Sequence, residues 1–98
     1  MAFRLIWAPA ARDNLKDVVS FIARDSRSRA ETFGFRLIRE VERLRDHPEL
    51  GSVVPELALP SVRELFVRSY RLIYRVFHET NSVEVIRVWH GARGAPEL

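Results

Sequence analysis

The sequence predicts an α+β fold in the order βααβββ, with a four-stranded antiparallel sheet that is mostly a meander and an N-terminal two-helix hairpin packed on one of its faces. Three observations predict this arrangement. Apolar residues repeat at helical spacing over residues 9–24, and again from residue 28 to the His47-Pro48 pair. Residues 70–77 alternate large apolar residues with arginine, which is the period of a strand. Short turns join this segment to strands expected at 63–67 and 83–89, so these three strands are antiparallel.

The first strand is expected from Phe3 to Trp7, and it completes the sheet after the helical hairpin. Pro9 follows it directly and is tolerated at the first position of a helix, where its missing N–H has no partner to lose. Ser28 and Glu31 match a capping box, so a second helix is predicted to start there.

Two features of the second helix point to its surroundings. Gly34 costs about 1 kcal/mol relative to alanine inside a helix. It is expected to allow a close approach to the first helix. Phe35 and Ile38 widen the apolar stripe beyond what one neighbour needs. The excess is interpreted either as more core or as a groove for a partner segment.

Residues 49–62 form a long loop whose apolar side chains suggest that it lies flat on the core, and residues 90–98 show no regular pattern. Within the strand at 70–77, one face carries the core residues and the other carries arginine. The core face holds Tyr70, Leu72, Tyr74 and Val76, and the second face holds Arg71, Ile73, Arg75 and Phe77.

The register of the last hairpin decides what the arginine face can do. Arg71 and Arg75 are about 13 Å apart along the strand and cannot hold one phosphate together. A turn centred between residues 80 and 81 places Arg71 opposite His90, which would make an acid/base site. A turn centred one half-step later pairs Arg75 with Arg87 and makes a purely electrostatic patch.

Three residues near the C-terminus are candidates for a functional role, and two of them also have a purely structural interpretation. His90 is either an acid/base group beside arginines or a strand-end histidine bonded to backbone. Trp89 either stacks on a base or a partner side chain, or packs half-buried in the domain. Arg93 follows Gly91 on a tail that is expected to reach a partner.

Composition limits the classes of function. The 98 residues form one domain, and their apolar and charged fractions, 47% and 30%, are those of an ordinary soluble protein, which is expected in the cytoplasm. No cysteine and only three scattered histidines argue against a metal site, and no cofactor is expected. Of sixteen Lys and Arg residues only Lys16 is lysine. This bias favours an acidic or nucleic-acid-associated partner, or reflects arginine-rich codon usage alone.

Four separate motifs in this chain together resemble the RelE/ParE family of bacterial toxins from type II toxin-antitoxin systems, and its ParE (plasmid stabilisation) branch in particular. The motifs keep their order over nearly the whole chain, and they are residues 7–11 (WAPAA) with Asp13 and Leu15, residues 47–51 (HPELG), residues 62–65 (VREL) with 70–76 (YRLIYRV), and residues 86–93 (IRVWHGAR).

The resemblance implies a cytoplasmic toxin of residues 1–98 that causes growth arrest and is held inactive by a small cognate antitoxin, ParD-like or similar, in a hetero-oligomer. RelE-like relatives cut mRNA in the ribosome, whereas ParE-like relatives are thought to block DNA gyrase without bond-making chemistry. Gly91 stands where an aromatic residue often follows the histidine of RNA-cutting relatives, and no lysine occurs in the loop or second strand. Both departures favour the ParE-like function.

The first hypothesis is therefore a gyrase inhibitor that is not an enzyme, has no cofactor and binds neither membrane nor specific nucleic acid. Its expected target-binding residues are Arg71, Arg75, Arg87, Trp89, His90 and Arg93. Its expected antitoxin-binding residues are Phe35, Ile38, Arg12 and Lys16. The alternative is a ribosome-dependent mRNA endonuclease with His90 as the acid/base and Arg71 on the phosphate, and a third possibility is an inactive relative that only binds an antitoxin.

Overall fold

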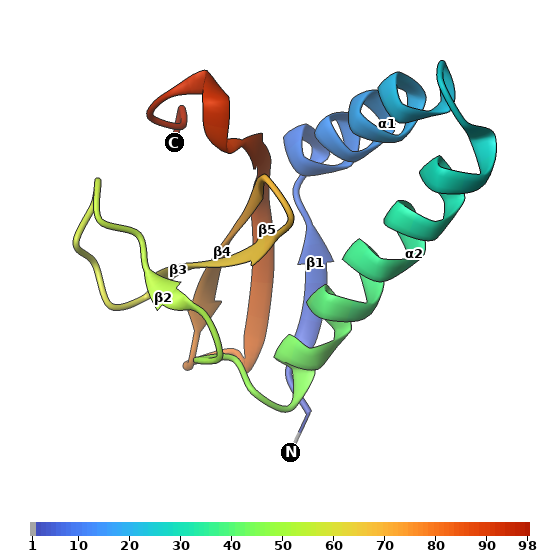
Figure 1. Ribbon diagram of the computed structural model, residues 1–98. Coiled ribbons are helices and arrows are strands. Elements are labelled where there is room, and N and C mark those ends of the chain that lie inside the picture. The colour runs from blue at the N-terminus through green and yellow to red at the C-terminus, as the bar shows by residue number, and fades with distance from the viewer. Residues whose placement is uncertain (1) are drawn as a thin grey trace.

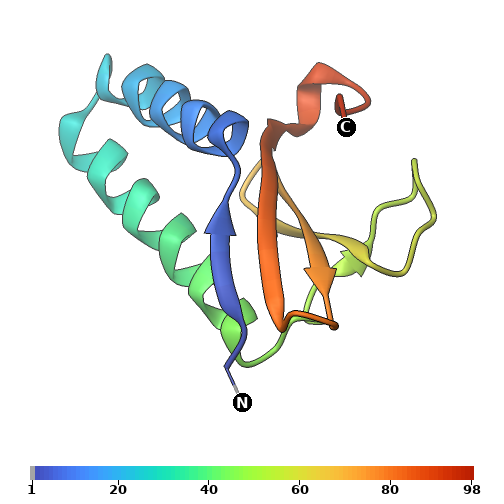
Figure 2. The ribbon, with the colours of Figure 1, turned by 180° about the vertical axis from the view of Figure 1, so that it is seen from behind.

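A computed structural model of the chain describes residues 2–98 and contains one mixed sheet with both helices on one side (Figures 1 and 2). The five strands lie in the order β1-β5-β4-β3-β2. Their bounds are β1 Arg4–Trp7, β2 Ser52–Val53, β3 Val62–Val67, β4 Tyr70–Phe77 and β5 Ser82–His90. The α+β class and the two-helix layer are confirmed.

The predicted four-stranded sheet is wrong in two details. The two-residue strand β2 forms inside the segment expected to be loop, where Ser52 and Val53 pair with Glu64 and Arg63 of β3. Strand β1 runs parallel to β5, with Arg4 opposite Ser82 and Trp7 opposite Val85. The helical hairpin between β1 and the meander acts as a crossover, and a strand that returns in this way pairs in parallel.

The helices are α1 Pro9–Ala23 and α2 Arg27–Glu42, followed by the 3-10 turn η1 Arg43–Arg45. Pro9 occupies the start of α1 as predicted. Helix α2 starts one residue before the predicted capping serine, because the Ser26 side chain caps it by accepting a hydrogen bond from the Arg29 N–H at 3.2 Å. The last turn before His47 is 3-10 rather than α.

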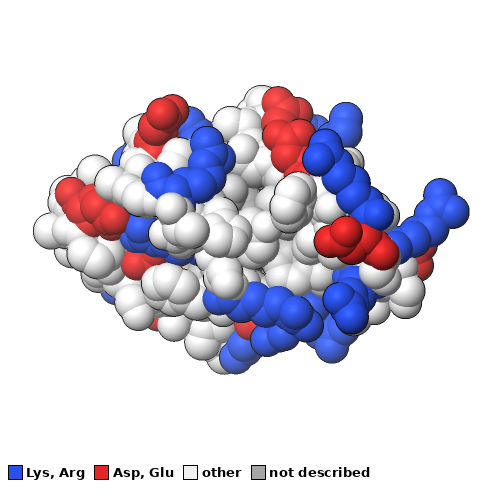
Figure 3. Space-filling model, turned by 45° about the horizontal axis from the view of Figure 1, so that its top comes forward, with Lys and Arg blue, Asp and Glu red and all other residues white. Residues whose placement is uncertain are grey.

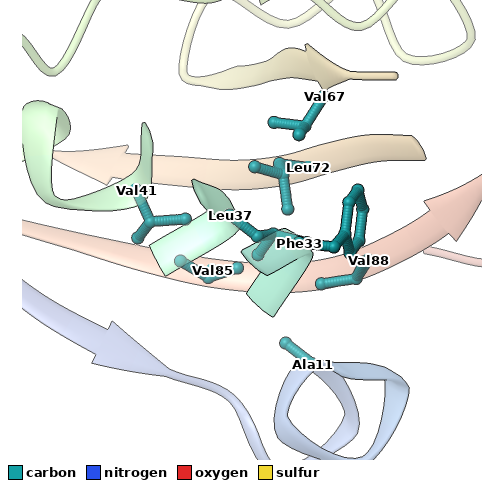
Figure 4. Close-up of a cluster of buried hydrophobic side chains, with 8 residues drawn as sticks. All are labelled: Ala11, Phe33, Leu37, Val41, Val67, Leu72, Val85 and Val88. Atoms are coloured by element: carbon teal, nitrogen blue, oxygen red, sulfur yellow. The ribbon is translucent and has the colours of Figure 1, made fainter. Parts of the chain in front are cut away.

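The main core fills the space between the two helices and the sheet (Figure 4). Leu37 and Val41 of α2 point toward Leu72 of β4 and Val85 of β5, while Ala11 of α1 closes the cluster from the other helix. The remaining members are Phe33, Val67 and Val88. A second cluster joins Leu44 of η1 to Tyr74, Val76 and Val83. The predicted core face of β4 is therefore confirmed.

The opposite face of the sheet is not simply an arginine face. Ile73 of β4 is fully buried there with Val62 of β3, Trp89 of β5 and Val54 of the loop. The loop touches this face through Val54, whereas Leu57 and Leu59 remain exposed, so it does not lie flat as predicted. Figure 1 shows the loop between β2 and β3 projecting on the side away from the helices.

Both predicted registers of the last hairpin are wrong. Arg71 lies opposite Trp89, and Arg75 lies opposite Glu84. The register shifts between Ile73 and Tyr74, which leaves Ile86 without a partner and forms a β-bulge. The bulge places Val85 and Val88 on the helix side together, and it places Trp89 on the far side and His90 on the helix side.

Candidate functional site

The far face of the sheet carries a cation held by two carboxylates. Arg71 donates its Nη1 and Nη2 hydrogens to the two oxygens of Glu56, both at 2.8 Å, and its Nε hydrogen to Glu64. Glu64 comes from β3 and Glu56 from the loop after β2. One arginine of β4 thus connects the neighbouring strand and the loop, and its fork geometry suits this double pairing.

Arg71 and Glu56 stabilise each other's ionised forms. The hydrogen bonds from Arg71 are the main reason that the pKa of Glu56 falls from 4.5 to about 2. The pKa of Arg71 is raised, first by its hydrogen bond to Glu56 and then by that to Glu64. Arg71 therefore stays charged and stays occupied by protein carboxylates.

Arg75 of β4 and Arg87 of β5, two further strand arginines, are half-buried on this face. Arg87 donates from Nη1 to the carbonyl oxygen of Ile86 at 2.8 Å. Arg75 lies opposite Glu84 in the register, and its buried Nε has no hydrogen-bond partner among the described residues. Their guanidinium groups keep more free donors than that of Arg71.

Trp89 is a packing residue at the end of this face, so the packing interpretation is confirmed. Its side chain is buried with Ile73, and its Nε1 donates to the carbonyl oxygen of Gly94 at 3.1 Å. The Arg93 guanidinium lies 4.3 Å from the centre of the indole ring. Residues Gly91–Arg93 form the 3-10 turn η2, so the tail predicted to be irregular is folded back at this point.

His90 lies on the other side of the sheet from Arg71. Its ring meets Tyr70 edge to face at 4.9 Å between ring centres, and its Nδ1 accepts a hydrogen bond from the Ala92 N–H at 3.0 Å. The backbone-bonded interpretation of His90 is therefore confirmed. A cleft of about 530 Å³ borders it and includes Arg24 and Arg93 in its lining.

The expected antitoxin-binding residues are exposed side chains of the helices. Phe35 and Ile38 of α2 are 68% and 43% exposed, so the apolar excess of this helix is not used by the core. Arg12 and Lys16 lie on the exposed side of α1. Gly34 brings α2 close to α1 as predicted, and a Cβ built there would lie 3.5 Å from Val19 Cγ2.

Sequence reasoning missed Glu56 and Glu64, the two acids that hold Arg71. The sequence held a signal for Glu64. It lies on the same strand face as Val62 and Phe66, and antiparallel pairing with the next strand places it on the face predicted for Arg71. Glu56 had none, because its position depends on how the loop returns to the sheet.

Residues 2–98 contain no group of three or more His, Asp or Glu side chains placed to hold a metal ion. Within the same residues no helix has the length and apolar character to cross a membrane.

The chain is a small α+β domain with one helical hairpin on a sheet and arginines on the opposite face. The family described as the ParE toxin of the type II toxin-antitoxin system parDE matches residues 5–94. The chain belongs to this family, and the expected RelE/ParE membership is confirmed. No curated protein sequence matches the chain significantly.

Solved structures of toxins share the fold. The chromosomal ParDE toxin-antitoxin system from P. aeruginosa matches with a TM-score of 0.73 and 17% identity, covering 91% of this chain and 96% of that chain. A doubly substituted RelE toxin from E. coli in the free state matches with a TM-score of 0.71 and 22% identity, covering 96% of this chain and 88% of that chain. The RelBE2 toxin-antitoxin complex from Mycobacterium tuberculosis matches at 0.67 and 22% identity, covering 92% of each.

Proposed function

We propose that this toxin is ParE-like, inhibits DNA gyrase by binding it, and is neutralised by a cognate antitoxin. Membership of the ParE toxin family supports the proposal. The observation that carries it is the separation of Arg71 and His90, which occupy opposite faces of the sheet because Arg71 pairs with Trp89 and His90 with Tyr70. The two groups that an RNA-cutting reaction would need on one phosphate cannot reach it together.

The available cations support a protein-binding surface. Arg71 is occupied by Glu56 and Glu64, whereas Arg75 and Arg87 retain free donors beside it. We infer that Arg75, Arg87 and Arg93 contact the target and that Arg71 shapes the face beneath them. Trp89 contributes as the ring that holds Arg93 in place.

A supercoiling assay tests this function. Purified toxin should inhibit supercoiling of relaxed plasmid by gyrase, and adding the antitoxin should restore it. Arg87→Ala should raise the concentration needed for inhibition about 5-fold, as expected for the loss of one exposed ion pair. Arg4→Ala, which removes an exposed arginine of β1, is the matched control. Normal supercoiling in the presence of a toxin that still arrests growth would overturn the proposal.

The antitoxin is proposed to dock as a helix on α2, where Phe35 and Ile38 are exposed, with Arg12 and Lys16 of α1 at its side. The ParDE and RelBE2 structures that share this fold are toxin-antitoxin systems. Hydrogen exchange with and without antitoxin should show protection of α2. Protection limited to residues 90–98 would place the antitoxin elsewhere.

An mRNA endonuclease is the second candidate, and one observation favours it. His90 borders a cleft whose lining includes Arg24 and Arg93, so an imidazole and two guanidinium groups share one hollow. His90→Ala should then abolish transcript cleavage during translation. Unchanged toxicity in that variant would exclude this function.

A further inference from the structure

We propose that Phe66 of β3 is the apolar anchor of the far face, where it packs against an apolar side chain on the surface of the target protein. Phe66 lies directly opposite Arg71 in the pairing of β3 with β4, so its ring is on the far face of the sheet. Trp89, the aromatic residue expected to contact the target, is instead buried in the domain. This role of Phe66 rests on the proposed function, because it concerns how the far face recognises its target.

The ring of Phe66 is uncovered. Its side chain is 64% exposed, whereas Ile73 on the same face is fully buried. Strand β2 pairs only with Arg63 and Glu64, so Phe66 lies beyond its end and no strand within residues 2–98 covers its outer side. Aromatic side chains are enriched in protein interfaces, and an uncovered ring at the open end of a sheet gives a partner apolar surface to bury.

The backbone and neighbours of Phe66 are held firmly. Val67, the next residue of β3, is buried in the main core. Arg71, directly opposite Phe66, is fixed by its bonds to Glu56 and Glu64. A side chain on such a paired strand loses little conformational freedom when it binds, and this preorganisation favours affinity. Phe66 therefore has both the exposure and the fixed position that an interface anchor needs.

The charges beside Phe66 favour a protein over a nucleic acid. Arg71, Glu56 and Glu64 carry one positive and two negative formal charges next to the ring. A base stacked on Phe66 would bring its own phosphate close to this cluster, which would repel it. An apolar side chain of a protein brings no charge to the ring, so the cluster does not oppose it. Figure 3, in which the top of Figure 1 comes forward, shows Asp and Glu among Lys and Arg on both sides of an uncharged area.

A free cation of this face lies farther from the ring. Arg87 is two strands away from Phe66 and two residues along β5, which separates their Cα atoms by about 12 Å. Glu84 lies opposite Arg75 and offsets part of its charge, whereas Arg87 lies opposite the uncharged Ile73. The matching surface of the target therefore has an apolar side chain against Phe66 and a carboxylate about 12 Å away at Arg87.

A gyrase supercoiling assay with purified toxin variants tests the role of Phe66. Phe66→Ala should raise the toxin concentration needed for inhibition about 10-fold, and Phe66→Leu should stay within about 3-fold of the wild type, because leucine keeps an apolar contact. Phe21→Ala is the matched control, since it removes a phenylalanine that is 61% exposed on α1, on the other side of the sheet. This control should inhibit as the wild type does. Unchanged thermal melting of each variant shows that the fold is kept.

Growth arrest by toxin expressed without antitoxin gives a second measurement, which does not depend on the identity of the target. Phe66→Ala should arrest growth only at higher expression than the wild type. A wild-type toxin that leaves supercoiling unchanged would refute gyrase as the target. The role of Phe66 is refuted if Phe66→Ala arrests growth as the wild type does, or if Phe21→Ala loses as much inhibition. Binding of a single-stranded oligonucleotide that is lost in Phe66→Ala would identify a base-stacking site instead.

Discussion

Arg71 of β4 donates its Nε hydrogen to the carboxylate of Glu64 of β3, and the two side chains are only 11% and 4% exposed. Its remaining donors bind Glu56 in the loop that follows β2. Arg71 was expected to contact a target, and it instead serves as a structural cation on that face of the sheet. Changes at Arg71 should therefore alter stability.

Arg71→Ala should lower the free energy of unfolding by about 3 kcal/mol, because it leaves the Glu64 carboxylate buried without its cation. Urea denaturation followed by circular dichroism measures this change. The double variant Arg71→Met with Glu64→Leu should recover most of the loss, since a buried pair can be replaced by apolar side chains. A single variant as stable as the wild type would show that Glu64 is solvated.

The bond between Arg71 and Glu56 makes stability depend on pH in the acid range. The pKa of Glu56 is about 2 in the fold against an ordinary 4.5. The contribution of Glu56 to the free energy of unfolding is complete above pH 4.5 and disappears as the pH falls toward 2, because the Glu56 carboxyl group binds its proton first in the unfolded chain. Thermal melting across this range should show a steeper loss for the wild type than for Glu56→Gln. Parallel curves for the two proteins would contradict the pairing.

Tyr74→Phe should lower the free energy of unfolding by about 1 to 3 kcal/mol. The Tyr74 hydroxyl accepts the Gly51 N–H at 2.8 Å, and the variant leaves this buried donor without a partner. Tyr70→Phe is the control, because no hydrogen bond of the Tyr70 hydroxyl is present among the described residues. Chemical denaturation of both variants should separate them, and equal losses would count against this bond.

Gly34→Ala should raise the free energy of unfolding by about 0.5 to 1 kcal/mol, since alanine is the better helix former. A Cβ at this position would make only an ordinary contact with Val19. Gly51→Ala should do the opposite, because its Cβ would overlap the Glu64 carbonyl and lie 2.8 Å from the Tyr74 hydroxyl. Thermal melting temperatures that move in the same direction for both variants would refute this comparison.

Local patterns predicted the parts of the fold that depend on neighbouring residues. The helices, the bounds of β4 and its core face follow from spacing, and Gly34 correctly indicated the approach of the helices. Pairing between distant segments was not predictable in this way. The parallel contact of Arg4 with Ser82 and the bond between Glu56 and Arg71 depend on how long connections return. The sequence analysis accordingly named Arg71 without the two acids that bind it.

The bulge at Ile86 determines how changes in chain length would affect the two rings near the C-terminus. Residue 86 has no partner, so deleting it would leave every existing pair of β4 and β5 opposite its present neighbour. Inserting one residue after Val88 would instead exchange the sides of Trp89 and His90. A relative with the same terminal residues at a different spacing would therefore have the opposite ring on the helix side of its sheet.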